Sequence, residues 1–305
     1  MTEESPSADP TEESLSDTRP HPQLDPQRYY DEYGHEEWDR LEATLGGKLE
    51  FEGTVASLER FLPTSSSASA SSCSPSSVRV LDVGGGAGRY SVWLAAKGYD
   101  VTLVDLSERQ CEIAREKVEE HEVTEHVHVQ RGDLRSLPIS SDAFDAVLCT
   151  GGPLSHVVDD EERATALSEL RRVATPDAPV FVSVMSRLAV LQNLVHEPEF
   201  YLTLSHICES GSYTRELAAE HFDDPEFVEC HFFRAAELEA ALERAGFTVD
   251  AVVGLEGIAA NVGERIALED VDEAEIEAVT ETVRRLRTDP AVADWSNHIL
   301  AVGRA

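Results

Sequence analysis

Residues 78–107 constrain the fold of this chain more than any other stretch. An apolar run rich in Val and Leu ends at Gly84, and an apolar-periodic stretch begins at Tyr90. A second apolar run, residues 101–104, ends at the acidic residue Asp105. This order is typical of a strand, a tight turn, a helix and a second strand that pairs in parallel with the first. Glycines at the turn allow positive φ and a close approach of the backbone to a ligand, and the following helix presents free N–H groups.

The spacing of the glycines separates the ligand classes that use such turns. The dinucleotide pattern G-x-G-x-x-G, started at Gly84, requires Gly or Ala at position 89, where Arg89 stands. The phosphate-binding pattern G-x-x-x-x-G-K-[ST] is also absent, because no Lys follows any of these glycines. The pattern that fits is D-x-G-x-G-x-G, formed by Asp82, Gly84, Gly86 and Gly88.

This pattern resembles motif I of the class I S-adenosylmethionine (SAM) dependent methyltransferases. In that family the glycine turn packs against the amino acid and ribose of SAM, and an acid at the end of the second strand binds both ribose hydroxyls. Asp105 follows Gly84 by 105 − 84 = 21 residues, which is where that acid is expected. The resemblance therefore implies SAM as the cofactor. The residues of this stretch expected to bind it are Asp82, Gly84, Gly86, Gly88, Arg89, Asp105 and Leu106.

The patterns beyond residue 107 extend the unit into one sheet. Helical patterns cover residues 108–121, 161–173, 235–245 and 272–288, and strand patterns cover 126–130, 144–149, 180–184, 247–253 and 298–302. We expect an α/β fold with a doubly wound, Rossmann-like sheet of seven mostly parallel strands. By resemblance, the last strand is antiparallel and lies between the fifth and sixth strands.

Two further segments are expected at the cofactor. In the family, a Gly-Asp pair after the third strand carries an acid that binds the adenine amino group, which implies this role for Asp133, with Leu134 beside it. Ligands of open parallel sheets bind outside the carboxyl ends of the strands, so Thr150 and the loop after it should border the transferred methyl group. The sequence G-G-P-L-S-H of this loop resembles loops in small-molecule methyltransferases related to the quinone-biosynthesis enzymes. The N/D-P-P-Y motif of amino-directed nucleic-acid methyltransferases is absent.

Two histidines are candidates for removing a proton from the methyl acceptor. His is the side chain whose ordinary pKa, about 6.5, suits that task. His156 is the better placed, because it follows the fourth strand on the ligand side, and His231 is the second candidate. A single loop histidine more often has a structural role, and this alternative stays open for both.

Composition divides the rest of the chain into segments. Residues 1–27 are expected to be a disordered acidic tail, and residues 64–77 a flexible Ser-rich linker. Residues 28–63 have aromatic and apolar residues at helical spacing and predict two helices broken at Gly46-Gly47. They look like a helical cap that places Tyr29 and Tyr30 over SAM, although both aromatics could simply pack on the sheet. The main domain, residues 78–305, contains an aromatic insertion, residues 186–230, that could roof the substrate pocket.

Charge limits the partners of the chain. Asp and Glu outnumber Lys and Arg by 59 to 25, which gives a formal charge of −34. Such an excess repels itself in dilute buffer and is screened in molar salt, so the composition looks like that of a salt-loving cytosol. It also argues against nucleic acid as a partner, because there is no basic stripe to bind phosphates. The five cysteines form no C-x-x-C pair or Cys/His cluster, so no metal site is expected.

The sequence therefore predicts a cytoplasmic, SAM-dependent methyltransferase that acts on a small molecule. No basic n-region precedes an apolar stretch, and no window is apolar over the roughly 18 residues of a membrane span. A non-catalytic SAM-binding protein, an RNA or protein methyltransferase and, less favoured because of Arg89, a dehydrogenase are the alternatives. The residues identify neither the acceptor, nor the methylated atom, nor the oligomeric state.

Overall fold

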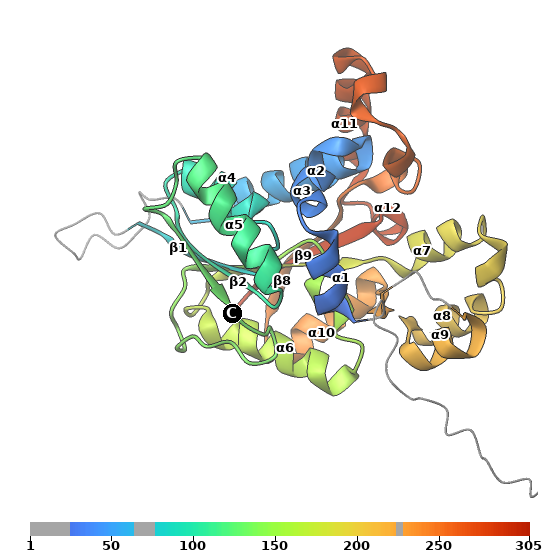
Figure 1. Cartoon of the computed structure of the whole chain (residues 1–305), viewed down its shortest axis with the longest axis horizontal. Helices are drawn as coiled ribbons and strands as arrows, with labels where there is room; N and C mark the ends of the chain where they lie inside the picture. The colour runs from blue at the N-terminus through green and yellow to red at the C-terminus, as the bar shows by residue number, and fades with distance from the viewer. Residues whose placement is uncertain (1–24, 64–76, 224–227) are drawn as a thin grey trace, which may run out of the picture.

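The computed structural model describes residues 25–63, 77–223 and 228–305 and places a seven-stranded sheet at its centre (Figure 1). The strand order is β3-β2-β1-β4-β5-β9-β8. The strands of this sheet are β1 (Arg79–Val83), β2 (Asp100–Asp105), β3 (Val127–Arg131), β4 (Ala146–Cys149), β5 (Pro179–Met185), β8 (Thr248–Gly254) and β9 (His298–Arg304).

The pairing of the strands confirms the expected topology. The first five strands are parallel, with Val80 opposite Val101 in the β1–β2 pair and opposite Ala146 in the β1–β4 pair. The last strand, β9, is antiparallel to both β5 and β8 and lies between them. The order of the strands reverses between β1 and β4, so their carboxyl ends diverge there and leave space for a ligand.

Helices cover both faces of the sheet, and successive residues of the buried strands point to opposite faces. Val80 packs with Tyr90 and Leu94 on one face, whereas Leu81 and Val83 pack toward the other face with residues of α6 and α10. Figure 1 shows α4 and α5 on one side of the strands and α6 and α10 on the other. The helices of this domain are α4 (Arg89–Ala96), α5 (Glu108–Glu120), α6 (Asp160–Val173), α10 (Ala235–Arg244), α11 (Glu273–Leu286) and α12 (Pro290–Trp295).

The predicted cap consists of three helices, not two: α1 (Pro26–Tyr33), α2 (Glu36–Ala43) and α3 (Leu45–Phe61). The predicted break at Gly46-Gly47 is wrong, because α3 runs through both glycines and begins after Thr44, whose Oγ1 accepts the Gly47 N–H at 3.0 Å. A Cβ on Gly47 would lie 2.3 Å from the Arg40 carbonyl oxygen. The glycines therefore let α2 and α3 pack closely instead of ending a helix.

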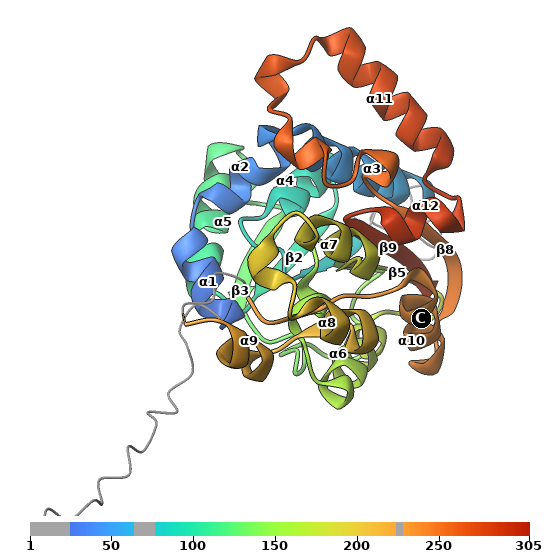
Figure 2. The same cartoon turned by 90° about the vertical axis from the view of Figure 1, so that its right-hand side faces the viewer.

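The insertion between β5 and β8 is mainly helical and has its own core. Its elements are α7 (Arg187–Leu194), α8 (Leu204–Ser210), β6 (Ser212–Tyr213), α9 (Arg215–His221) and β7 (Cys230–His231). Phe200, Tyr213, Phe222 and Phe232 pack against one another within this insertion. Figure 2 shows α7, α8 and α9 grouped at one side of the sheet. Helix α11 lies away from this group and contacts α3.

The remaining segment predictions lie mostly outside the described residues. The predicted tail falls there up to residue 24, and α1 begins at Pro26, two residues before the predicted boundary at Arg28. The predicted linker lies outside except for Ser77. Among the described helices, none is long and apolar enough to cross a membrane.

Candidate functional site

A cavity of about 630 Å³ lies at the carboxyl ends of β1, β2 and β4. Its walls come from the glycine turn after β1, from the segments after β2, β3 and β4, and from the cap helices α1 and α2. This volume is within the range of about 300–1,000 Å³ that small-molecule sites occupy. Nine of the twelve predicted cofactor residues line it: Tyr30, Gly84, Gly86, Arg89, Asp105, Leu106, Asp133, Leu134 and Thr150.

The glycine turn forms the floor of the cavity. Gly84 has φ +67°, and a Cβ there would lie 2.4 Å from Pro153 in the loop after β4. Gly86 has φ +53° and faces Glu37 of the cap. Both positions therefore require glycine, because a side chain would strain the backbone and close the space.

Asp105 ends β2 at the side of this turn. Its Oδ2 accepts the Gly86 N–H and its Oδ1 accepts the Ser107 N–H, each at 2.9 Å. Burial raises the pKa of Asp105 to about 6, although the two N–H groups work against the shift. The carboxylate is thus fixed in place and lines the cavity as an ionised acceptor at neutral pH.

Three predicted cofactor residues do not line the cavity. Asp82 is fully buried beneath the turn, where its Oδ2 accepts the Ser91 hydroxyl at 2.7 Å and burial raises its pKa to about 6. Gly88 is the N-cap residue of α4 and has φ +88°. Tyr29 stacks on Tyr33 within α1. The structure thus places Asp82 and Gly88 as supports of the turn and Tyr29 in the packing of the cap.

The other predicted residues line the walls. Asp133 is held by the Arg135 guanidinium, with the Arg135 Nη2 to Asp133 Oδ2 distance at 2.7 Å, and this pairing lowers the pKa of the carboxyl. Arg89 stacks on Trp38, with its Cζ 4.7 Å from the ring centre, and pairs with Glu42, so it ties α4 to the cap. Leu106 and Leu134 supply apolar wall next to the acids.

Glu37 and Arg40 of α2 also line the cavity, and the sequence did not single them out. The Arg40 Nη2 lies 3.8 Å from the position of a Cβ on Gly151, and the Glu37 Cγ lies 3.3 Å from that on Gly86. Arg40 is anchored from behind by Glu50, at 2.5 Å from Nη1 to Oε2. Their only sequence signal is opposite charge at i, i+3 on a helix, which does not indicate a cavity.

The two candidate histidines have different surroundings. His156 lines the cavity and lies 3.2 Å from the Tyr30 hydroxyl through its Nε2, and burial lowers its pKa to about 4. His231 is buried outside the cavity, with Nδ1 2.8 Å from the Ser212 hydroxyl and Nε2 2.7 Å from Glu237 Oε1. Both of its nitrogens are engaged in holding β6 and β7 to α10. We therefore carry the proton-transfer hypothesis forward for His156 alone.

The expected aromatic roof is absent from the described part of the insertion. Of its described residues only Glu229 lines the cavity, and Phe200, Tyr213 and Phe222 belong to the separate core described above. The cover over the strand ends comes instead from α1. Gln110 of α5 donates through Nε2 to the Tyr30 carbonyl at 2.8 Å, while the Tyr30 hydroxyl reaches His156 on the β4 side.

The cavity contains features that a SAM molecule would satisfy. The Thr150 hydroxyl is buried, lines the cavity and has no hydrogen-bond partner among the described residues. Seven of the lining side chains are acidic and three are arginines, so the described lining suits a ligand with positive charge. The residues present therefore fit SAM, which carries a sulfonium cation.

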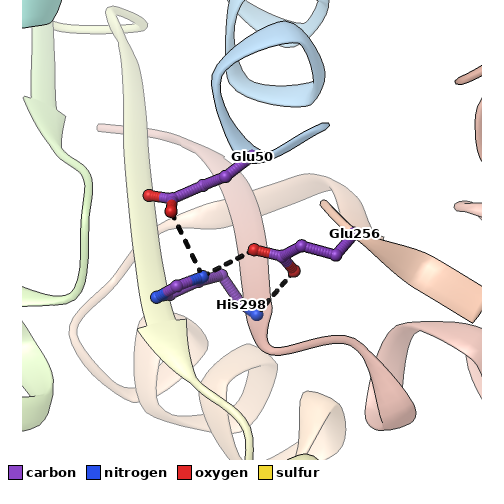
Figure 3. A group of neighbouring side chains, drawn as sticks. All are labelled: Glu50, Glu256 and His298. Atoms are coloured by element: carbon purple, nitrogen blue, oxygen red, sulfur yellow. Dashed lines mark hydrogen bonds and ion pairs between the residues drawn. The ribbon is translucent and has the colours of Figure 1, made fainter. Parts of the chain in front are cut away.

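A second cluster, made of Glu50, Glu256 and His298, brings three possible metal ligands within 4.8 Å of one another (Figure 3). Its atoms already have protein partners. Arg40 pairs with Glu50, the Ser296 hydroxyl and the His298 backbone N–H donate to Glu256, and His298 Nδ1 lies 2.7 Å from Glu256 Oε1. Although burial lowers the pKa of His298, Glu50 and Glu256 outweigh it and raise the pKa to about 9. The imidazole is thus protonated at neutral pH, and the cluster is an ion-pair network.

Comparisons with known proteins agree with this geometry. A family described as a methyltransferase domain matches residues 80–177. A demethylmenaquinone methyltransferase of Clavibacter sepedonicus is 35% identical over 108 residues, which are 35% of this chain and 41% of that protein. A ubiquinone biosynthesis O-methyltransferase of Xanthomonas axonopodis is 30% identical over 182 residues, 59% of this chain and 67% of that protein. A SAM-dependent methyltransferase structure from Methanosarcina mazei has a TM-score of 0.53 at 19% identity and covers 75% of this chain and 92% of its own.

Proposed function

Because this chain belongs to the class I SAM-dependent methyltransferases, we propose that its cavity holds SAM and that the methyl acceptor is a small molecule. SAM supplies an electrophilic methyl group on a sulfonium that is already a good leaving group. The protein then mainly positions the acceptor, and positioning can be worth about 7–11 kcal/mol of the barrier.

The residues that would hold SAM follow from their chemistry. Asp105 would accept the ribose hydroxyls, and Asp133 and Leu134 would contact the adenine. Glu37 lies over the glycine turn and Arg40 lies beside Gly151 in the loop after β4, and they would pair with the ammonium and carboxylate groups of the amino acid end. Thr150 would donate its free hydroxyl in the same region. The cap helix α2 is therefore part of the proposed cofactor site.

The enclosure of the cavity by α1 is the observation that carries the small-molecule proposal. Gln110 and Ser107 hold one side of α1, through the Tyr30 and Gly34 carbonyls and through Asp31, and His156 meets Tyr30 on the other side. A helix across the strand ends narrows the access of a bulky polymer to the cavity. A polymer substrate would need an open, basic groove, and the described lining is acidic.

Replacing Asp105 by alanine should weaken SAM binding about 10- to 100-fold, because a charge-assisted hydrogen-bond pair of about 1.5–3 kcal/mol is lost. Calorimetric titration with SAM measures the change. Asp100→Ala is a matched control at the other end of β2, outside the cavity, and should bind SAM like the parent. Equal affinity of Asp105→Ala and the parent would show that Asp105 does not hold the ribose.

The acceptor class can be tested with SAM that carries a deuterated methyl group. The enzyme and labelled SAM are incubated with an extract of the cells that make the protein, and the small-molecule, RNA and protein fractions are examined by mass spectrometry. We expect the label in the small-molecule fraction, and about 10- to 100-fold less of it when Asp105→Ala replaces the parent at SAM concentrations below the dissociation constant of the parent. Label in RNA or protein would refute the small-molecule proposal.

A further inference from the structure

Tyr30, His156 and the backbone carbonyl of Glu229 form a continuous chain of hydrogen bonds at the cavity wall. The Tyr30 hydroxyl lies 3.2 Å from His156 Nε2, and His156 Nδ1 lies 3.3 Å from the Glu229 carbonyl oxygen. A carbonyl oxygen can only accept, so the hydrogen of the neutral ring must be on Nδ1. The lone pair is then on Nε2, and the Tyr30 hydroxyl donates to it.

Both members of this pair are uncharged at neutral pH. Burial lowers the pKa of His156 to about 4, with partial compensation by the hydrogen bond to Glu229. Burial and the nearby Glu37 raise the pKa of Tyr30 well above its usual value. The Tyr30 ring meets the imidazole edge-on, at 5.6 Å between centres and 81° between planes, and its backbone is fixed by Gln110. The contact is therefore rigid and neutral.

We infer that Tyr30 and His156 relay the proton of the methyl acceptor, and that the acceptor is an uncharged hydroxyl compound such as a phenol. This inference rests on the proposed function and names the substrate class for the same site. After donating its hydrogen to His156, the Tyr30 oxygen still has a lone pair that can accept a hydrogen bond from an acceptor hydroxyl. Both Tyr30 and His156 line the cavity, so this lone pair is accessible to a bound molecule.

The proton moves in two linked transfers. As the acceptor oxygen bonds to the methyl carbon and the carbon–sulfur bond breaks, the acceptor proton passes to Tyr30 Oη and the Tyr30 proton passes to His156 Nε2. His156 becomes an imidazolium whose Nδ1–H still donates to Glu229, and the charge that the sulfonium loses reappears on the ring. A return of the proton to water restores the neutral pair.

The order of events follows from the weakness of this base. A phenol has an ordinary pKa of about 10, whereas burial lowers the pKa of His156 to about 4, so ionisation of the acceptor beforehand is strongly unfavourable. The acceptor oxygen becomes strongly acidic only as it gains positive charge from the new bond. His156 therefore accepts the proton during methyl transfer and does not generate a phenoxide before it.

The charges around this end of the cavity favour an uncharged acceptor over an anion. Asp25, Asp159, Glu162 and Glu229 line it, and Arg135 already pairs with Glu162 and Asp133. A carboxylate or phosphate would meet this acidic rim, where Arg135 is already neutralised by its two acidic partners. A hydroxyl needs only one acceptor, which Tyr30 provides.

The relay can be tested without knowledge of the natural acceptor by using catechol as a probe and benzoate as its anionic counterpart. In protein with ¹⁵N-labelled histidine and bound S-adenosylhomocysteine, we expect His156 as the neutral Nδ1–H tautomer at pH 7. Catechol should bind saturably and shift the His156 resonances, and benzoate should bind more weakly. Tyr30→Phe should weaken catechol binding up to about tenfold while S-adenosylhomocysteine binds as in the parent.

Tyr33→Phe, one helical turn later on α1 and outside the cavity lining, is the matched control and should retain catechol binding. With labelled SAM and catechol, Tyr30→Phe should lower kcat about 100-fold without a change in KM for SAM. The Nε2–H tautomer, equal binding of benzoate, no catechol binding by the parent, or equal catechol binding by Tyr30→Phe would each overturn the relay. These failures leave S-adenosylhomocysteine binding intact, whereas failure of the parent to bind it would contradict the cofactor site itself.

Discussion

Replacing Glu50 by alanine is expected to lower the free energy of unfolding by about 3–5 kcal/mol. Glu50 is fully buried on α3 and pairs with Arg40 through two contacts, Nη1 to Oε2 at 2.5 Å and Nη2 to Oε1 at 3.2 Å. Removal of one partner leaves the other charge buried without compensation, and that penalty exceeds the worth of an exposed pair. His298 would also lose one of its two acidic neighbours.

The control for this variant lies two residues along the same helix. Glu52 pairs with Lys48 at 2.6 Å, and both side chains are more than a third exposed. Glu52→Ala should therefore cost only about 0.3–0.5 kcal/mol. Urea unfolding of the two variants and the parent measures both differences. Similar losses for Glu50→Ala and Glu52→Ala would mean that the buried Arg40–Glu50 pair does not stabilise the packing of α2 on α3.

The same variant connects stability to the proposed cofactor site. Arg40 reaches the cavity and its guanidinium pairs with Glu50, whereas Glu256 lies just after β8 and His298 begins β9. Figure 3 shows the carboxylates of Glu50 and Glu256 converging on the same nitrogen of the His298 ring, Nδ1. The network thus joins the cap to the β8–β9 edge of the sheet, and Glu50 is the member that contacts Arg40 directly.

The sheet was predictable because its signals are local. The glycines after β1, the acid at the end of β2 and the apolar runs of the strands each lie within a few consecutive residues, and the structure places them in the expected order. The place of β9 between β5 and β8 came from resemblance, because no local pattern reports which strands become neighbours.

The cap and the insertion show where local patterns fail. The pair Gly46-Gly47 resembles a helix break in the sequence. In the structure Gly47 is needed because α2 packs closely against α3, and that contact depends on residues of another helix. The aromatic residues 200, 213 and 222 resemble a pocket lining, but they form a core that the insertion needs for its own folding. The same residue types serve both purposes, and only tertiary contacts distinguish them.

The candidate site likewise contains residues that a local motif predicts and residues that only the tertiary structure brings to the cavity. Gly84, Gly86 and Asp105 line the cavity where the motif placed them, and Asp82 and Gly88 support the turn from beneath. Arg40 and Glu37 lie over 40 residues before the glycine turn in the sequence. Only the fold brings these two residues to the cavity, because α2 lies over the carboxyl ends of the strands.

Raising the pH from 7 to 10 should remove about 3 kcal/mol of stability through His298 alone. Its pKa is about 9 in the folded protein and about 6.5 in an unfolded chain. Below pH 6.5 both states bind the proton, so the stabilisation is fully present. Between these values only the folded state holds it, and each pH unit costs up to about 1.4 kcal/mol. The stabilisation is therefore lost as the pH rises through 9.

Other groups titrate in this range, so the difference between variants isolates His298. Its charge is set by Glu50 and Glu256, which raise its pKa, and by Arg40, which lowers it. In His298→Gln the fall of the unfolding free energy between pH 7 and 10 should be smaller than in the parent by about 3 kcal/mol. His126→Gln removes an exposed histidine paired with Asp100 at 3.0 Å and should keep the parent's slope. If His298→Gln and the parent lose stability equally, the His298 ring is neutral in the folded protein at pH 7.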